Sequence, residues 1–246
     1  MSCDCKLPKF IFCFLLAALW AALVNVPFAF AESEQVMLDK VQNLRLQLKN
    51  DEALKLADCA LKSYPKSVSG LIIRADLLKE LGLMKQAAAD LDKAYALAPE
   101  NMNVLQKHCR MLDMTGHLTE ALAEYDIILK KSPRDANFWS YRGQAHKRLK
   151  RWAEAAHDFE MAIKNQPNLR DLSSWLYEVG NCQFLAGNEQ AALKAFEELV
   201  KRFPDMSTGY WGKARVFDKM GKSADAEKQR ALAKKRDLEM APHNLF

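Results

Sequence analysis

The sequence predicts an all-α fold, an α-solenoid of about six helix-turn-helix units, and two periodic patterns support this prediction. Prolines recur at intervals of 34, 34, 34 and 37 residues, at Pro65, Pro99, Pro133, Pro167 and Pro204. An alanine precedes each proline by twelve residues, at Ala53, Ala87, Ala121, Ala155 and Ala192, and Ala226 continues the series. A period of this length is typical of stacked helical pairs that share one continuous core.

Each unit contains two amphipathic segments. In residues 136–169, Trp139, Gly143 and His146 recur at the spacing of one helix face, and a second such series begins at Ala155 after a turn near Lys150. Four other units have glycine in the turn, at Gly82, Gly116, Gly187 and Gly221. We expect these glycines to end the first helix with positive φ, and each proline to follow a second helix that it cannot continue.

The fourth unit contains Trp139, Gly143, Ala155, Phe159, Ala162 and Pro167 in register, and this pattern resembles the tetratricopeptide repeat. The resemblance implies a right-handed superhelix over residues 34–240. His146 and Gln183 stand where the family prefers Tyr, and Arg142 and Val179 where it prefers Leu. The expected repeats are about 34–67, 68–101, 102–135, 136–169, 173–206 and 207–240.

Between Pro167 and Pro204 the period is three residues longer, with the extra residues around 168–172. We expect a longer loop here, because solenoids place insertions in loops, and a fifth unit whose first helix starts near Asp171 or Ser173. The alternative is a local change of superhelix pitch that opens a groove beside Trp175 and Tyr177.

Residues 1–31 are typical of a secretory signal peptide. Lys6 and Lys9 precede an apolar run over residues 10–24, and Ala29-Phe30-Ala31 offers a cleavage site before Glu32. This predicts an exported protein, periplasmic or secreted. Residues 10–31 contain no charge and are long enough to cross a bilayer, so the alternative is membrane association through an uncleaved anchor in the inner membrane, with the body facing outward.

Composition excludes several classes of protein. The 246 residues are 50% hydrophobic, which disfavours disorder throughout the chain, and the net charge of +5 is too small to indicate nucleic acid as a partner. Outside residues 1–31 only Cys59, Cys109 and Cys182 remain, which is not a disulfide framework.

No catalytic or metal motif is evident, so we expect no catalytic residue, no metal site and no cofactor. His108 and His146 are interpreted as packing histidines, and the cysteines as buried structural thiols. The acidic pairs Asp90 with Asp92 and Glu197 with Glu198 are interpreted as solvated outer faces. An enzyme with an unrecognised site is the remote alternative.

Six aromatic residues occupy signature or turn-packing positions of the repeat, and we expect them in the core: Tyr125, Trp139, Trp152, Phe159, Phe196 and Phe217. Tyr177 and Trp211 instead take the fifth place of their units, which faces the inner groove in proteins that this chain resembles. The fifth and ninth places of four units form the first-helix strip: Gln106, Arg110, Ser140, Gln144, Tyr177, Asn181, Trp211 and Arg215.

Aromatic, amide and arginine side chains are those that recognition surfaces favour. The first-helix strip therefore predicts a non-enzymatic module of the cell envelope that binds a peptide or partner helix in a concave groove. The alternative is a membrane-tethered scaffold or assembly factor that uses its convex or terminal surfaces.

Overall fold

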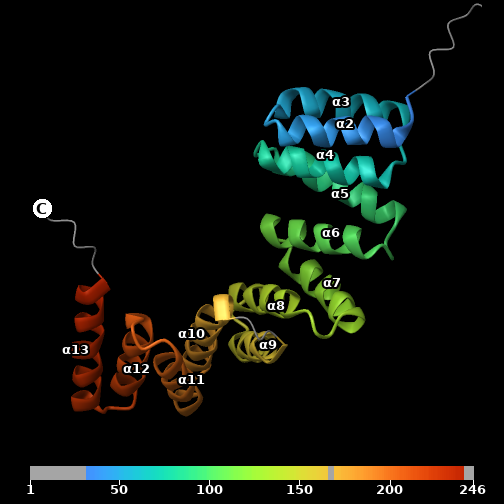
Figure 1. The fold of residues 1–246 in the computed structure, drawn as a ribbon. Helices are drawn as coiled ribbons and strands as arrows, with labels where there is room; N and C mark the ends of the chain where they lie inside the picture. Colours follow the sequence, from blue (N-terminus) through green and yellow to red (C-terminus); the bar gives the residue numbers. More distant parts are fainter. Residues whose placement is uncertain (1–31, 166–168, 241–246) are drawn as a thin grey trace, which may run out of the picture. The chain divides into compact units, whose positions relative to one another are not determined.

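The computed structural model describes residues 32–165 and 169–240, and every regular element in these ranges is an α-helix (Figure 1). The predicted all-α fold class is confirmed. The described residues divide into two compact units, and the division falls between residues 77 and 78. The predicted signal segment, residues 1–31, lies outside the described residues.

The first unit contains α2 (Glu34–Leu46), α3 (Asn50–Ser63) and most of α4 (Val68–Glu80). Helices α2 and α3 pack against each other. Val41 of α2, Ala53 and Ala57 of α3 and Leu77 of α4 form a buried cluster in this unit.

The second unit contains the following helices: α5 (Met84–Leu97), α6 (Met102–Thr115), α7 (Leu118–Lys131), α8 (Ala136–Arg148), α9 (Trp152–Asn165), α10 (Leu169–Leu185), α11 (Glu189–Arg202), α12 (Ser207–Lys219) and α13 (Ser223–Met240). Each of α6, α8, α10 and α12 packs against the helix that follows it. Contacts between α5 and α6, α7 and α8, α9 and α10, and α11 and α12 join successive pairs. The core is therefore a row of clusters, as a repeat architecture requires.

Small residues lie where helices approach closely. Every alanine of the periodic series, from Ala53 to Ala226, has no exposed surface. A Cβ added to Gly180 would come within 2.7 Å of the Phe196 ring, and one added to Gly212 within 2.4 Å of the same ring. Larger side chains would push these helices apart.

The predicted turns are confirmed. Gly82, Gly116, Gly187 and Gly221 have φ of 76°, 90°, 84° and 73°. In the fourth repeat Lys150 takes the same conformation with φ of 58°, although it carries a Cβ. The turn geometry is thus kept even where the residue is unfavourable for it.

Helix α10 corrects the prediction for the insertion. It begins at Leu169, before both expected start residues, Asp171 and Ser173, and has 17 residues where α8 and α12 have 13. Much of the added length is therefore helical, and the longer helix supplies hydrogen bonds to the added backbone groups. Trp175, beside which a groove was considered, is itself buried.

The core prediction is right for some aromatic residues and too strong for others. Tyr125, Phe159 and Phe196 are buried, whereas Trp139, Trp152 and Phe217 are half-buried. The indole N–H of Trp139 donates a hydrogen bond to the Pro133 carbonyl at 2.9 Å. This polar group explains why the Trp139 ring is only half-buried.

Two further expectations are wrong. Asp90 was expected on a solvated face but is only 2% exposed, and Cys59 was expected to be buried but is exposed. Cys109 and Cys182 are buried, as predicted. None of the described helices combines the length and apolar composition that crossing a membrane requires.

Candidate functional site

The first-helix strip is distributed over α6, α8, α10 and α12, two residues on each helix. Arg110 and Arg215 are exposed, and the other six residues are half-buried. All eight side chains are therefore at least partly accessible to solvent, although other residues of the same helices are buried in the core.

Hydrogen bonds link the strip from one repeat to the next. The Trp175 indole N–H donates to Ser140 Oγ at 2.9 Å, which joins α10 to α8. Arg215 Nη1 donates to Asn181 Oδ1 at 3.0 Å, which joins α12 to α10. The Arg215 guanidinium also lies 4.7 Å from the centre of the Phe184 ring. The strip is held in place by contacts between repeats rather than by single helices.

The two aromatic residues of the strip differ in their surroundings. The Tyr177 ring centre lies 6.1 Å from that of Phe196, in a tilted arrangement at the edge of a core cluster. Trp211 donates its indole N–H to Asp237 Oδ2 on α13 at 3.1 Å. Hydrogen bonds from Ser207 and Trp211 lower the pKa of Asp237. Asp237 was not among the site residues predicted from the sequence, because it lies on a second helix and the strip was drawn from first helices only.

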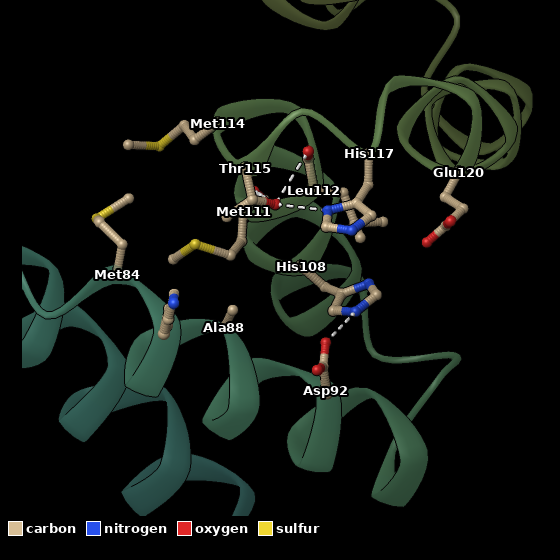
Figure 2. A pocket seen from close by; sticks show the side chains of 11 residues that line it. Met84, Ala88, Asp92, His108, Met111, Leu112, Met114, Thr115, His117 and Glu120 are labelled. Atoms are coloured by element: carbon tan, nitrogen blue, oxygen red, sulfur yellow. Dashed lines mark hydrogen bonds and ion pairs between the residues drawn. The ribbon is translucent and has the colours of Figure 1, made fainter.

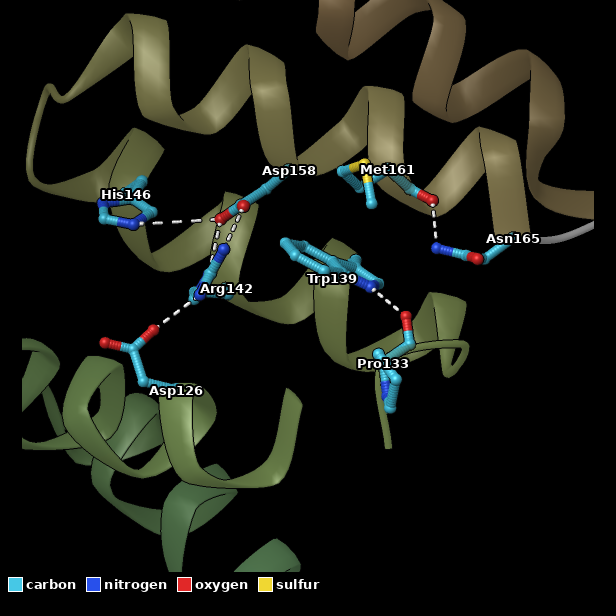
Figure 3. Close-up of polar contacts among 8 residues, drawn as sticks. All are labelled: Asp126, Pro133, Trp139, Arg142, His146, Asp158, Met161 and Asn165. Carbon is cyan, nitrogen blue, oxygen red and sulfur yellow. Dashed lines mark hydrogen bonds and ion pairs between the residues drawn. The ribbon is translucent and has the colours of Figure 1, made fainter. Parts of the chain in front are cut away.

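A second set of polar contacts extends from the other side of the first helices, and Figure 3 shows those of Arg142 in α8. Its Nε and Nη2 contact the two carboxylate oxygens of Asp158 at 3.0 and 2.7 Å, and its Nη1 contacts Asp126 at 2.5 Å. Asp158 is 1% exposed. Arg142 also lies 4.7 Å from the ring centre of Trp139. The bidentate pair joins α8 to α9, and Asp126 adds α7.

His108 makes the equivalent contacts one repeat earlier. Its Nδ1 lies 2.7 Å from Glu124 Oε1 and its Nε2 lies 3.1 Å from Asp92 Oδ1, while its ring stacks on Tyr95 at 4.5 Å. Burial opposes the charge on the ring, but the hydrogen bonds and charges of Glu124 and then Asp92 outweigh it and raise the pKa of His108.

These contacts follow one rule, and we call them the polar series. A cationic or histidine side chain contacts an acidic residue sixteen positions before it: Arg74 with Asp58, His108 with Asp92, Arg142 with Asp126 and Lys213 with Glu197. His108 and Arg142 also contact an acid sixteen positions after them. The departures from the family pattern at Arg142 and Val179 were a signal for this series that sequence reasoning did not use.

A groove of about 580 Å³ lies where α5, α6 and α7 meet, next to His108 (Figure 2). Figure 2 shows the thioethers of Met84, Met111 and Met114 gathered at one end of this groove. His117 and Glu120 line the other end. The groove is lined mainly by apolar groups, with a few polar side chains.

The buried thiols are held in their protonated form. Burial raises the pKa of Cys182 to about 12 and also raises that of Cys109. Cys109 Sγ donates to the Ala121 carbonyl at 3.3 Å. Within residues 32–165 and 169–240, no group of three or more His, Cys, Asp or Glu side chains is arranged to hold a metal ion.

Models of the tetratricopeptide repeat match residues 38–101, 115–169 and 176–205, which together make up more than half of the chain. The human mitochondrial import receptor subunit TOM70 is 29% identical over 153 residues, which covers 57% of this chain. Human tetratricopeptide repeat protein 13 is 25% identical over 168 residues, or 65% of this chain. The chain spans less than a quarter of the length of either relative.

Solved structures with the same fold include a tetratricopeptide repeat protein from Parabacteroides merdae. Its TM-score is 0.66 at 18% identity, covering 84% of this chain and 80% of that one. YrrB, described as a TPR protein with an unusual peptide-binding site, has a TM-score of 0.61 at 15% identity, covering 76% of this chain and 93% of that one. These similarities extend the helical repeat fold to most of the chain.

Proposed function

Because the chain belongs to the tetratricopeptide repeat family, we propose that it is a non-enzymatic binding module that holds a peptide or partner helix along the first-helix strip. The observation that carries this proposal is the accessibility of all eight strip residues on four successive first helices. Repeats of this kind form extended binding surfaces. The receptor role in the name of TOM70 and the peptide-binding site in that of YrrB support the same reading.

The chemistry of the strip favours a partner with both apolar and hydrogen-bonding groups. Trp211 and Tyr177 offer aromatic surface, while Gln106 and Gln144 offer amides that can pair with an extended backbone. Arg110 adds an exposed cation whose guanidinium lies 5.2 Å from the centre of the Tyr141 ring. A peptide with an aromatic or aliphatic anchor and an acidic residue fits this arrangement.

The test begins with a selection of displayed random peptides against the full chain, followed by measurement of the affinity of a selected peptide. Trp211→Ala should weaken binding roughly thirtyfold, as expected for truncation of an aromatic anchor. Arg110→Glu should weaken binding of an acidic peptide, and high salt should reduce that difference. Lys201→Glu, an exposed change on α11, is the control and should have little effect.

Circular dichroism separates loss of binding from loss of fold, because Trp211 also contacts Asp237. The proposal that the strip binds the peptide would be refuted if every strip variant bound the selected peptides normally and if surface substitutions on second helices abolished binding. Such a result would favour the scaffold function instead.

We also propose that the body is exported, on the basis of the signal-like residues 1–31. Sequencing the N-terminus of the protein isolated from its native cells should find Glu32 first. An intact N-terminus on a membrane-bound protein would instead support the uncleaved anchor.

A further inference from the structure

The polar series is incomplete at one junction, between α9 and α10. Here the first-helix position that Arg142 holds in α8 is occupied by Val179, and Ala195 stands sixteen residues later in place of a second acid. The acidic residue of the preceding helix is kept: Glu160 lies nineteen residues before Val179, because this repeat is three residues longer. The junction thus retains an acceptor and lacks the cation.

Glu160 is exposed, and its Oε1 accepts a hydrogen bond from the Gln183 amide at 3.3 Å. Among the residues that the structure describes, no Lys, Arg or His forms an ion pair with Glu160. By contrast Asp126, its counterpart one repeat earlier, lies 2.5 Å from Arg142. A carboxylate with only a neutral partner is able to accept a further, charged donor.

A groove of about 440 Å³ opens beside Glu160. Leu176, Val179 and Ala195 form an apolar floor and are each less than 10% exposed. The border carries two acidic residues, Glu160 and Glu198, and one basic residue, Lys194, and Glu198 pairs with Arg202 at 2.5 Å. The groove therefore offers apolar surface below and one carboxylate without a charged partner at its edge.

We propose that this groove, which we call the Glu160 groove, binds an arginine side chain supplied by a protein partner. The guanidinium pairs with Glu160, and its methylene groups lie on Val179 and Ala195. Arginine suits both parts, since its stem covers apolar surface while its head forms charge-assisted hydrogen bonds. Arg142 shows the arrangement that the partner's arginine would restore, with its guanidinium against the acid of the preceding repeat.

The Glu160 groove goes beyond the proposed function, because it is a second surface on the opposite side of the same helix. Val179 and the strip residue Tyr177 are two positions apart in α10, and successive positions of a helix turn by about 100°, so their side chains point in nearly opposite directions. Changes in the groove should therefore leave peptide binding along the first-helix strip intact. Failure of one proposal would not imply failure of the other.

The test uses the full chain and two small probes, N-acetylarginine methylamide and N-acetylcitrulline methylamide. The two probes have the same shape, but citrulline is neutral. NMR titration should give saturable shifts at the amides of Val179 and Ala195 with the arginine probe and roughly tenfold weaker binding of the citrulline probe.

Glu160→Gln removes the charge and keeps the shape, and it should reduce affinity for the arginine probe to that for the citrulline probe. Ala191→Trp fills the groove from its exposed border and should weaken both probes. Glu197→Gln is the matched control, because Lys213 already fills that junction at 4.0 Å, and it should change nothing. Equal binding of both probes, or unchanged binding by Glu160→Gln, would overturn the proposal. Shifts confined to other surfaces would overturn it as well.

Discussion

Two junctions occupy equivalent places in successive repeats but are stabilised differently. The first is formed by α7, α8 and α9, and the second by α9, α10 and α11. At the first, Arg142 joins Asp126 and Asp158. At the second, Val179 and Ala195 belong to an apolar cluster, and Glu160 stands beside an open groove. The first junction pairs the charges of Arg142, Asp126 and Asp158 within the chain, whereas the second leaves the charge of Glu160 for a partner.

This difference shows that a repeat can exchange polar for apolar packing at one position without losing its fold. The exchange is possible because both partners are replaced together. Arg142 and Asp158 in one repeat correspond to Val179 and Ala195 in the next. A buried acid without its cation would be costly. The exposed acid of the preceding repeat carries no such cost, and it is kept.

The largest expected effect comes from breaking the polar junction. Arg142→Met leaves Asp158, 1% exposed, without its bidentate partner and should lower the free energy of unfolding by roughly 3–5 kcal/mol, measured by urea denaturation. The double variant Arg142→Val with Asp158→Ala rebuilds the composition of the next junction and should recover most of that loss. A double variant no more stable than Arg142→Met would refute the equivalence of the two junctions.

The apolar junction should instead be sensitive to volume. Ala155 has no exposed surface and lies in the same cluster as Val179, so Ala155→Leu should overpack it and cost about 1–3 kcal/mol, measured as a lower thermal midpoint. Ala153→Leu, on an exposed position of the same helix, is the control and should be close to neutral. An unchanged midpoint for Ala155→Leu would contradict the repeat register.

The His108 junction should depend on pH. Because the folded-state pKa of His108 is raised above its ordinary value, its charged form stabilises the fold at low pH. This stabilisation should be complete below about pH 6.5 and disappear as the pH rises through the folded-state pKa. The stability difference between the parent and His108→Gln should therefore be larger at about pH 5.5 than at about pH 8.5, by on the order of 1 kcal/mol.

Both proteins in this comparison should carry His146→Gln, since burial lowers the pKa of His146 and gives it the opposite pH dependence. A difference that grows as the pH rises would show that Glu124 and Asp92 do not stabilise the charged ring.

The smallest effect is expected at the last junction of the series. Lys213 and Glu197 are 4.0 Å apart and Glu197 is 54% exposed, so Lys213→Met should change the free energy of unfolding by less than about 1 kcal/mol. Urea denaturation at low and high salt checks this. If Lys213→Met lowered the free energy of unfolding as much as Arg142→Met, burial of the acidic partner would not determine how strongly each pair of the polar series stabilises the fold.

The repeat period, the small residues at close approaches and the turn positions were all predictable from sequence. Each depends on local geometry: Gly116 is needed where φ is positive, and Ala155 where two backbones meet. The eight strip residues follow from the same register, and their role in binding stays a prediction. The start of α10 was not predictable, because three added residues can extend either a helix or a loop.

The sequence by itself determined that this chain is a helical repeat protein. Alanine, glycine and proline recur at fixed positions of the period, and each of them specifies local structure or close packing there. Only the tertiary structure decided which polar groups meet. Asp90 and Asp158 look like surface residues in the sequence, yet both are buried. The partners of a polar side chain such as Arg142 lie sixteen residues away in neighbouring helices, so the distances that bring them together arise only when repeats stack.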